Sequence, residues 1–273
     1  MKNSKMKKVT VFLGSTTKRA TYQAVQEFVT DLKSYAEIDC EYVFLDDYNL
    51  GNCKGCLLCF VKGEEYCSLI DDRDILLEKL YNSDGVIFAT PNYSLQVSAL
   101  MKTFLDRLAF VFHRPRFFGK TFTAIVAQGI YGGNSIIKYL ENVAGYWGFD
   151  VTKGCCATVP QTVLDQKKNT QEIKKASARF YKNLMRSAPP TPSFFRLMMF
   201  RFIRTSYKML MNEKLQDPKK EIGIFELDCC YYKENGWFES DYYYKTPLGF
   251  FKKLAGRFFD FLQKQMAKHK NMV

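Results

Sequence analysis

The sequence predicts a doubly wound α/β fold, with a parallel five-stranded sheet in the strand order 2-1-3-4-5 and a helical, basic C-terminal extension. Over the first 160 residues, short and nearly all-apolar runs alternate with helix-like apolar spacing. Such runs are typical of parallel strands that are covered on both faces. The formal charge of +12 is uneven, because residues 1–160 carry 18 Lys+Arg and 17 Asp+Glu, whereas residues 161–273 carry 22 and 11.

Five apolar runs predict the strands, at residues 8–13, 41–45, 84–90, 121–127 and 151–159. Helical spacing predicts helices over residues 21–35, 72–81, 98–112, 134–147 and 165–187. The last of these helices would complete an α/β domain over residues 1–188. In sheets of this order, ligands bind at the carboxyl ends of the strands, where the strand order reverses.

The run Ala-Pro-Pro-Thr-Pro at residues 188–192 separates a second predicted domain, residues 189–273, because no helix could continue through it. This domain would contain a Met- and Phe-rich helix over 194–211, an aromatic stretch over 226–244 and a final helix over 248–268. Its helices would dock on the rest of the chain or on a second subunit. The alternative is peripheral membrane contact through residues 193–273, since basic amphipathic helices rich in Phe attract anionic lipid.

Composition narrows the class of protein. With 47% hydrophobic residues the chain can bury a sizeable core. No apolar run approaches the roughly 18–20 residues of a membrane span, and the apolar run at 9–13 is too short for a signal-peptide core, so we expect a cytoplasmic location.

No aromatic–basic RNA-binding motif accompanies the net positive charge, so we expect no nucleic-acid partner. Only two His are present, without a hydrolase constellation, and no residue is predicted to be catalytic.

The loop after the first predicted strand has the chemistry of an anion site. Residues 14–21 read Gly-Ser-Thr-Thr-Lys-Arg-Ala-Thr, so hydroxyls, backbone amides and a helix N-terminus converge there beside two cationic side chains. We expect a phosphate group to be held by Ser15, Thr16, Thr17, Lys18 and Thr21. The alternative is a plain turn that caps the helix. The GxxxxGK[ST] order of a Walker loop is absent, which disfavours ATP.

Two further loops end at the same predicted edge of the sheet. After the third strand come Pro91, Asn92, Tyr93 and Ser94, which offer a fixed turn, polar contacts and a ring that could lie near a flat heterocycle. After the fourth strand, glycines would let the backbone approach a ring edge closely. The residues expected there are Gln128, Gly129, Gly132 and Gly133. Either loop alone would be an ordinary turn. All three loops, however, end at the same edge of the sheet, where the strand order reverses, and this predicts a binding site.

Four of the nine cysteines follow the spacing Cys53-x2-Cys56-x2-Cys59-x7-Cys67. Three thiols at intervals of three can converge on one side of a turn, and a fourth completes a set of ligands for a [4Fe-4S] cluster or zinc. The alternative is that the thiols bind no metal and only line the active site. The other five, Cys40, Cys155, Cys156, Cys229 and Cys230, are interpreted as buried small hydrophobic residues. Asp71 and Asp72, after the loop, are predicted to cap the next helix.

These motifs resemble the flavodoxin-like NADPH-dependent FMN reductases, in particular the iron-sulfur flavoprotein branch. The matching stretches are GSTTKRAT, CKGCLLCFVKGEEYC followed by SLIDD, and ATPNYSLQVSALMKTFLDR. The resemblance implies that the first loop binds the FMN phosphate, that the other two flank the isoalloxazine, and that the four cysteines hold a [4Fe-4S] cluster that passes electrons to FMN. The family's first loop usually reads GSPRK, so Thr16 and Thr17 depart from its pattern.

The predicted function is that of an FMN-dependent oxidoreductase. It would transfer electrons from NAD(P)H or a reduced protein donor to a small acceptor, either a quinone, a nitro compound, a flavin or a metal ion. The protein would supply placement and electrostatics, and the cofactor the redox chemistry. The alternative is a flavin and iron-sulfur electron carrier between protein partners, with no small-molecule substrate of its own. The resemblance also implies a homodimer or homotetramer.

Overall fold

The computed structural model describes residues 6–159 and 162–270, with side chains up to residue 267. Residues 1–5 and 271–273, at the outer ends of the two predicted domains, therefore lie outside the described residues. The chain divides into two compact units. The first unit combines Met1–Lys54 with Leu69–Ala188, and the second combines Gly55–Ser68 with Pro189–Val273. A segment of the N-terminal half, which carries three of the four clustered cysteines, thus belongs to the unit that contains the C-terminal extension.

A parallel sheet forms the centre of the first unit. Its strands are β1 (Lys7–Leu13), β2 (Ile38–Phe44), β3 (Gly85–Pro91), β4 (Thr121–Gln128), β5 (Asp150–Val151) and β6 (Cys155–Thr158). They lie in the order β2-β1-β3-β4-β5, and β6 also pairs with β4. Neighbouring strands are parallel, with Leu13 opposite both Phe44 and Ala89. The predicted fold class and strand order are therefore confirmed.

The fifth predicted strand, residues 151–159, is divided into β5 and β6, both paired with β4. Thr152 leaves the ladder, although its backbone N–H and its hydroxyl both donate to the Phe122 carbonyl oxygen, at 2.8 and 3.0 Å. At Gly154 the backbone approaches β4 so closely that an added Cβ would lie 2.2 Å from the Ala124 carbonyl oxygen. The interruption therefore depends on a residue without a side chain.

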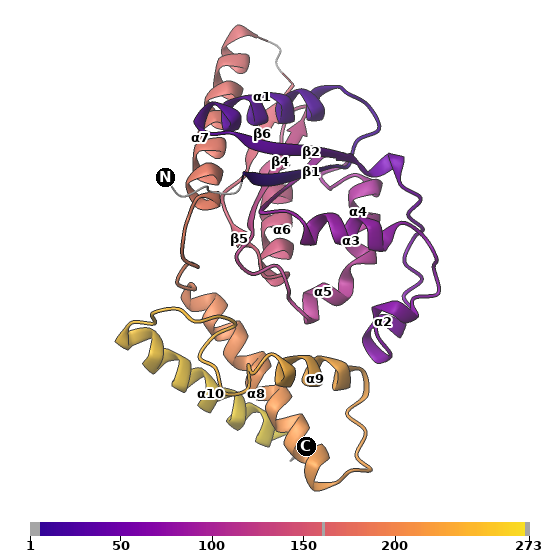
Figure 1. The fold of residues 1–273 in the computed structure, drawn as a ribbon, viewed down its shortest axis with the longest axis vertical. Helices are drawn as coiled ribbons and strands as arrows, with labels where there is room; N and C mark the ends of the chain where they lie inside the picture. The colour runs from indigo at the N-terminus through magenta and orange to yellow at the C-terminus, as the bar shows by residue number, and fades with distance from the viewer. Residues whose placement is uncertain (1–5, 160–161, 271–273) are drawn as a thin grey trace. The chain divides into compact units, whose positions relative to one another are not determined.

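Helices cover both faces of the sheet (Figure 1). They are α1 (Ala20–Tyr35), α3 (Arg73–Tyr81), α4 (Ala99–Arg107), α5 (Ala109–His113), α6 (Gly133–Tyr146) and α7 (Val163–Leu184). One core, under α1 and α7, contains Val11, Phe28 and Phe180. On the other face, the rings of Phe88 and Trp147 pack edge to face. Because side chains alternate along a strand, β1 supplies residues to both cores.

The predicted helix over residues 98–112 is two helices, since the backbone at Leu108 (φ −108°, ψ 20°) leaves the helical conformation between α4 and α5. The Ser98 hydroxyl caps α4 by accepting from the Met101 N–H at 3.2 Å. Helix α7 begins with a capping box between Thr162 and Asp165. These local caps explain why the helix starts lie close to the predicted positions.

The second unit contains α2 (Leu58–Val61), α8 (Phe194–Gln216), α9 (Glu226–Glu234) and α10 (Phe250–Lys270), with short 3-10 turns η2 (Glu64–Tyr66) and η3 (Gly223–Phe225). Helices α8 and α10 pack along each other, and α2 packs against α9 and η3. The unit's interior is aromatic, with the Tyr232 ring edge to face against Trp237 and Tyr207. Within the described part of the chain, every helix is too short or too polar to cross a membrane.

Candidate functional site

The first predicted loop lies at the carboxyl end of β1, where it adjoins β3. The Gly14 N–H donates to the Ala89 carbonyl oxygen at 2.8 Å. Ser15 and Thr21 are buried, whereas Thr16, Thr17 and Lys18 are exposed. Helix α1 begins with no acidic residue in its first turn and with no described side chain capping it. Its N-terminus is therefore electropositive and suited to an anion.

Lys18 is held close to this helix start. Its ammonium nitrogen lies 5.8 Å from the ring centroids of both Tyr22 and Phe44, within the range of a cation–π contact. The Ser15 hydroxyl donates to the Thr17 carbonyl oxygen at 3.4 Å, which is a long and weak hydrogen bond. The loop thus combines one oriented cation with a hydroxyl that is only weakly engaged within the protein.

The second loop forms a tight hairpin. Tyr93 and Gln96 exchange backbone hydrogen bonds of 3.0 Å, while Ser94 and Leu95 both adopt positive φ (50° and 63°). Two positive φ values in a two-residue loop are typical of a type I′ turn. Pro91 ends β3 as a buried residue, and the Asn92 N–H donates to the Ala127 carbonyl oxygen at 2.7 Å. The hairpin therefore projects from the same strand edge as the third loop.

Asn92 connects the second and third loops. Its side-chain N–H donates to the Tyr131 carbonyl oxygen at 2.8 Å. Its Oδ1 atom is buried, and no described group donates to it. A buried acceptor without a donor is costly unless a ligand or water satisfies it. This orphaned oxygen thus has unused acceptor capacity where the second and third loops meet.

The third loop is shaped by its own side chains. The Gln128 amide donates to the Thr158 hydroxyl (3.1 Å) and the Ile130 carbonyl oxygen (3.3 Å), and its oxygen accepts from the Gly133 N–H (2.7 Å). The Gln128 side chain thus shapes the loop through hydrogen bonds within the protein. Its cofactor contact stays a prediction of the sequence.

The glycines of the third loop differ in their surroundings. An added Cβ would lie 2.6 Å from Leu95 Cδ2 at Gly132, where φ is +96°, and 2.3 Å from Cys156 Sγ at Gly133. No described atom lies within 4 Å of the equivalent position at Gly129. Gly132 and Gly133 thus permit close packing of protein on protein, and Gly129 borders open space.

Large apolar side chains of both loops are exposed at this edge of the sheet. Tyr93 is 64% exposed, Ile130 80% and Tyr131 67%. Sequence reasoning singled out Tyr93 but missed Leu95, Ile130 and Tyr131, although the last two stand among the glycines of the third loop. Clustered apolar exposure is typical of a surface that a ligand or partner covers. The arrangement fits a flat aromatic ligand with an anionic tail directed toward α1.

A separate cavity of about 390 Å³ lies among α1, β6 and α7. Gln23, Glu27, Gln166 and Asn169 contribute to its lining. The Asn169 side chain already bonds both the N–H and the carbonyl oxygen of Thr158, at 3.1 and 2.6 Å. The three loops therefore remain the stronger candidate site.

The residues that flank the cysteine-bearing segment, Cys53 to Cys67, are held by hydrogen bonds within the first unit. Asp71 accepts from the Gly51 N–H at 3.0 Å and from Arg107 at 2.7 Å. Asp72 accepts from the Asn49 N–H at 2.7 Å. The Asp72 side chain makes no cap hydrogen bond to the described part of α3, so its predicted capping role is wrong, whereas Asp71 does accept from the Arg73 N–H at 3.2 Å.

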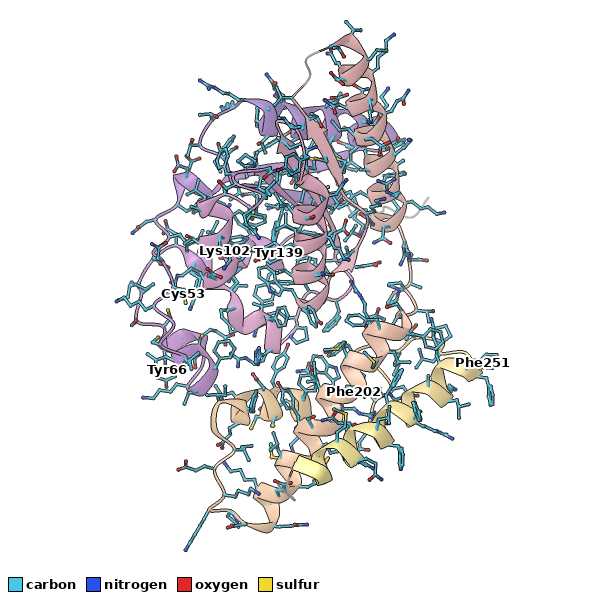
Figure 2. The ribbon with its side chains drawn as sticks, turned by 180° about the vertical axis from the view of Figure 1, so that it is seen from behind. Cys53, Tyr66, Lys102, Tyr139, Phe202 and Phe251 are labelled. Atoms are coloured by element: carbon cyan, nitrogen blue, oxygen red, sulfur yellow. The ribbon has the colours of Figure 1, made fainter. Side chains whose placement is uncertain are left out.

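Burial alone would raise the pKa of Asp71, but its hydrogen bonds from Arg107, Gly51 and Arg73 outweigh this effect and hold the pKa below its usual range. Beside it, the Thr103 hydroxyl donates to Asn52 Oδ1 at 3.1 Å. Figure 2 labels Cys53 and Lys102 in this region. A polar side chain of α4 thus contacts the start of the cysteine-bearing segment.

The four predicted metal ligands are divided between the units. Cys53 belongs to the first unit, and Cys56, Cys59 and Cys67 belong to the second. Across residues 6–159 and 162–270, no group of three or more His, Cys, Asp or Glu is close enough to hold a metal ion. The described arrangement therefore does not fit a four-thiolate cluster or a zinc ion.

Of the other five cysteines, Cys155 and Cys229 are buried as expected, whereas Cys40, Cys156 and Cys230 are only partly buried. Burial raises the pKa of the Cys155 thiol to about 12 and that of Cys156 to about 11. Such thiols stay protonated near neutral pH and are poor nucleophiles.

Comparisons with known proteins agree with this fold. The model of the NADPH-dependent FMN reductase family matches residues 7–163. Two iron-sulfur flavoproteins of Archaeoglobus fulgidus are 36% identical over 141 residues (50% of this chain, 60% of the relative) and 30% identical over 123 residues (45% and 59%). This chain spans about 60% of the length of these curated relatives.

Among solved structures, an NAD(P)H:quinone oxidoreductase from Methanothermobacter marburgensis superimposes with a TM-score of 0.51 at 17% identity. The match covers 63% of this chain and 96% of that structure. At this identity the likeness shows the fold alone. The family assignment comes from the matched residues, which include all three loops, and on that ground the chain belongs to the NADPH-dependent FMN reductase family.

Proposed function

We propose that this protein is an FMN-dependent oxidoreductase that transfers electrons from NAD(P)H, or from a reduced protein donor, to a small acceptor. Quinones, nitro compounds, free flavins and metal ions are the acceptor classes that the proposal includes. The observation that carries it is the convergence of three loops, after β1, β3 and β4, at one edge of the sheet where the strand order reverses.

Each loop has a part in holding the cofactor. The α1 N-terminus, with Ser15, Thr17, Lys18 and Thr21, would bind the phosphate of FMN. The orphaned Asn92 Oδ1 would accept a hydrogen bond from the polar edge of the ring system. The apolar rim of Tyr93, Ile130 and Tyr131 would cover the ring and exclude water from it. When bound, FMN supplies the redox chemistry.

A homodimer or homotetramer would help to cover the exposed rim. The [4Fe-4S] cluster stays a prediction of the cysteine spacing, and no step of the proposed reaction passes through it. Iron, sulfide and zinc analysis of anaerobically purified protein tests that prediction directly.

A second candidate function is an electron carrier between protein partners. The exposure of Tyr93, Ile130 and Tyr131 favours the carrier function. A protein partner could cover all three side chains, whereas a small acceptor is too small to do so. The two candidates differ in steady-state turnover. An oxidoreductase oxidises NAD(P)H with a quinone or nitro acceptor, whereas a carrier shows almost no turnover without its partner.

The cofactor assignment is tested by titrating flavin-free protein with FMN and following flavin fluorescence. We expect stoichiometric binding, with the Ser15→Ala/Thr21→Val variant binding at least about tenfold more weakly, because two hydroxyl donors to a charged group are lost. Ser34→Ala, at an exposed hydroxyl on the far end of α1, is the matched control and should bind like the wild type. Protein that does not bind added FMN would refute the proposal.

A further inference from the structure

Helix α10 presents a continuous row of large apolar side chains to solvent. Phe250, Leu254, Phe258 and Phe261 recur at helical spacing and are between 55% and 75% exposed. Phe251, beside the row, is 77% exposed. In Figure 2 the Phe251 side chain projects from the start of α10, whereas Phe202 lies on α8. Among the described residues of its own unit, no element covers this outward apolar face.

Cationic residues run along one edge of this outward apolar face. Lys253, Arg257 and Lys264 are exposed and stand at helical spacing on α10. At the start of the helix, the Lys252 ammonium nitrogen lies 5.7 Å from the Phe194 ring centroid on α8. The helix therefore has a hydrophobic face bordered by positive charge, which is the pattern of helices that lie in a membrane interface.

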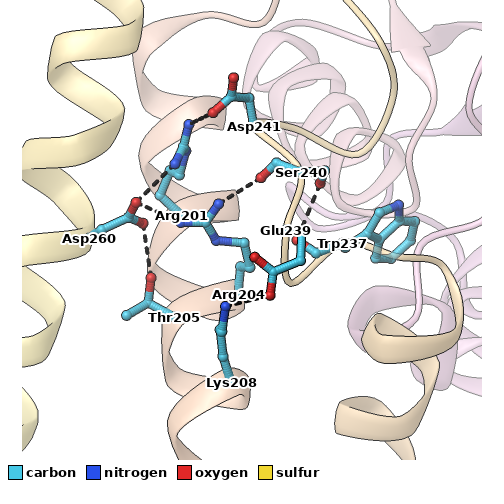
Figure 3. A network of polar contacts seen from close by, with 9 residues as sticks. All are labelled: Arg201, Arg204, Thr205, Lys208, Trp237, Glu239, Ser240, Asp241 and Asp260. Carbon is cyan, nitrogen blue, oxygen red and sulfur yellow. Dashed lines mark hydrogen bonds and ion pairs between the residues drawn. The ribbon is translucent and has the colours of Figure 1, made fainter.

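The acidic side chain of α10, Asp260, is directed away from this outward apolar face. The sequence of the helix contains a single acidic residue, Asp260. Figure 3 shows its carboxylate among side chains of α8. It accepts from Arg201 at 2.9 Å and from the Thr205 hydroxyl at 2.9 Å, and it pairs with Arg204 at 2.6 Å.

Residues on the α8-facing side of α10 fix the rotation of the helix. An added Cβ at Gly256 would lie 3.0 Å from Arg201 Nε. Gln263 donates to the Ser206 hydroxyl at 2.7 Å. Because Gly256, Asp260 and Gln263 share one side of the helix, the four-residue row is held on the other. The polar network thus keeps the Asp260 carboxylate on the α8-facing side, whereas Lys253, Arg257 and Lys264 border the outward face.

We propose that the outward face of α10 binds the surface of an anionic lipid bilayer, with the helix lying in the plane of the interface. The Phe and Leu side chains would enter the headgroup boundary, and Lys253, Arg257 and Lys264 would contact lipid phosphates. Each cation near such a surface contributes to binding, and the effect is screened by salt.

Charge argues against a second copy of this chain as the occupant. Helix α10 carries six Lys+Arg against one Asp, so two copies of its outward face would repel each other. An anionic bilayer complements both features of the face, since it offers apolar depth and negative charge. Contact is expected at the surface only, because the described helices include none that could cross a membrane.

Co-sedimentation of the full chain with vesicles tests the proposal. One vesicle preparation is phosphatidylcholine alone, and the other contains about one third phosphatidylglycerol. We expect binding to the anionic vesicles, at least about tenfold stronger than to the neutral ones, and its loss as salt is raised to about 0.5 M. Equal binding to both preparations, or to neither, would overturn the proposal.

Two sets of substitutions locate the contact. The apolar variant is Phe251→Ser/Phe258→Ser/Phe261→Ser, and its control changes three exposed apolar residues of the first unit, Ile75→Ser/Val163→Ser/Leu164→Ser. The charge variant is Lys253→Gln/Arg257→Gln/Lys264→Gln, and its control changes three exposed lysines of α7, Lys167→Gln/Lys168→Gln/Lys174→Gln. Both α10 variants should bind anionic vesicles about tenfold more weakly or worse, and both controls should bind like the wild type.

Circular dichroism checks that each variant is folded, which we expect because all the substituted side chains face solvent. Light scattering coupled to size-exclusion chromatography measures the mass of the wild type and the apolar variant. An unchanged mass supports the lipid surface as the occupant. If the apolar variant dissociates an oligomer, the face is an interface between copies and the proposal fails.

Discussion

Arg107 donates a hydrogen bond of 2.7 Å to Asp71, and both side chains are almost completely buried, with 3% and 5% of their surfaces exposed. The same carboxylate accepts from the backbone N–H groups of Gly51 and Arg73. Through these three donors the Asp71 carboxylate links the chain before the cysteine segment, at Gly51, with the chain after it and with Arg107 of α4.

Replacing Asp71 with Asn should therefore destabilise the first unit strongly. The substitution removes the carboxylate charge that pairs with the buried Arg107 guanidinium, and losing one partner of a buried pair costs about 3–5 kcal/mol. Urea denaturation measures the free energy of unfolding. The control is Asp106→Asn, which removes a surface pair with Lys102 and should cost less than about 1 kcal/mol.

The effect of Asp71→Asn should also depend on pH. Because the folded protein holds the pKa of Asp71 below its usual range, the ionised carboxylate stabilises the fold fully above the unfolded pKa of about 4. That stabilisation is lost as the pH falls through the lowered folded value. The difference in unfolding free energy between wild type and variant should thus shrink in acid. A difference that stays constant from neutral pH into strong acid would contradict the role given to this charge.

Gly132→Ala should destabilise the third loop. Its φ of +96° disfavours any residue with a Cβ, and that atom would lie 2.6 Å from Leu95 Cδ2. We expect a loss of about 2 kcal/mol and weaker FMN binding, because the second and third loops would separate. Gly129→Ala, where the surroundings are open, should leave thermal stability unchanged. If Gly129→Ala weakens FMN binding without a loss of stability, the backbone at 129 approaches the ligand directly.

Asn92→Leu should weaken FMN binding and leave the fold largely intact. The substitution removes the orphaned Oδ1 acceptor and the donor to Tyr131, which is a bond on the surface of the unit. Losing a hydrogen bond to a buried ligand group costs about 1–3 kcal/mol, which raises the dissociation constant roughly 5- to 150-fold. Fluorescence titration with FMN checks this, and urea denaturation is the control. Unaltered affinity would mean that the oxygen is satisfied by something other than the cofactor.

Much of the first unit could be predicted from the sequence, because its strands are short runs of β-branched and aromatic residues between strong turn signals. Strand β1 illustrates this: Val9, Val11 and Leu13 serve one core and Phe12 the other, so an unbroken apolar run indicates burial on both faces. The three loops follow from the same reasoning, since the ends of parallel strands share one edge of the sheet.

The contacts that the sequence could not reveal are long-range ones. The sequence around Asp71 has the signs of a helix cap, but its partners Gly51 and Arg107 are 20 and 36 positions away. The sequence predicts a cofactor contact for Gln128, but only the fold places the Thr158 hydroxyl next to its side chain. The cysteine spacing indicates a local four-ligand loop, whereas the structure assigns Cys53 to one compact unit and the other three to the second. No local pattern reveals such a division.

Removal of residues 189–273 should expose the segment around Lys62. Within the second unit, α2 packs against α9 and η3, so a chain that ends at Ala188 leaves this segment without its partners. Trypsin should cleave after Lys62 at least about tenfold faster in the shortened chain, because cleavage follows local unfolding. Cleavage after Lys174, on α7, is the internal control and should keep its rate. Equal protection of Lys62 in both chains would show that the segment folds by itself.

Thiol labelling should separate the cysteines into reactive and protected groups. Cys53 and Cys56 are exposed, whereas Cys155 and Cys229 are buried. Burial raises the pKa of both buried thiols to about 12. At about pH 8, fewer than roughly one in a thousand of these thiols would be ionised, and only the thiolate reacts with iodoacetamide. Mass spectrometry of native protein should therefore find Cys53 and Cys56 alkylated first, with Cys155 and Cys229 labelled only after denaturation.

The same experiment bears on the metal prediction, because thiolates bound to iron or zinc are shielded from alkylation. If Cys53 and Cys56 react freely in protein purified without oxygen, the arrangement described here is the one in solution. If they are protected until a chelator is added, while Cys155 stays protected throughout, the four spaced thiols hold a metal. Cys53 must then join the other three, and the division of the segment between the units would not describe the loaded protein.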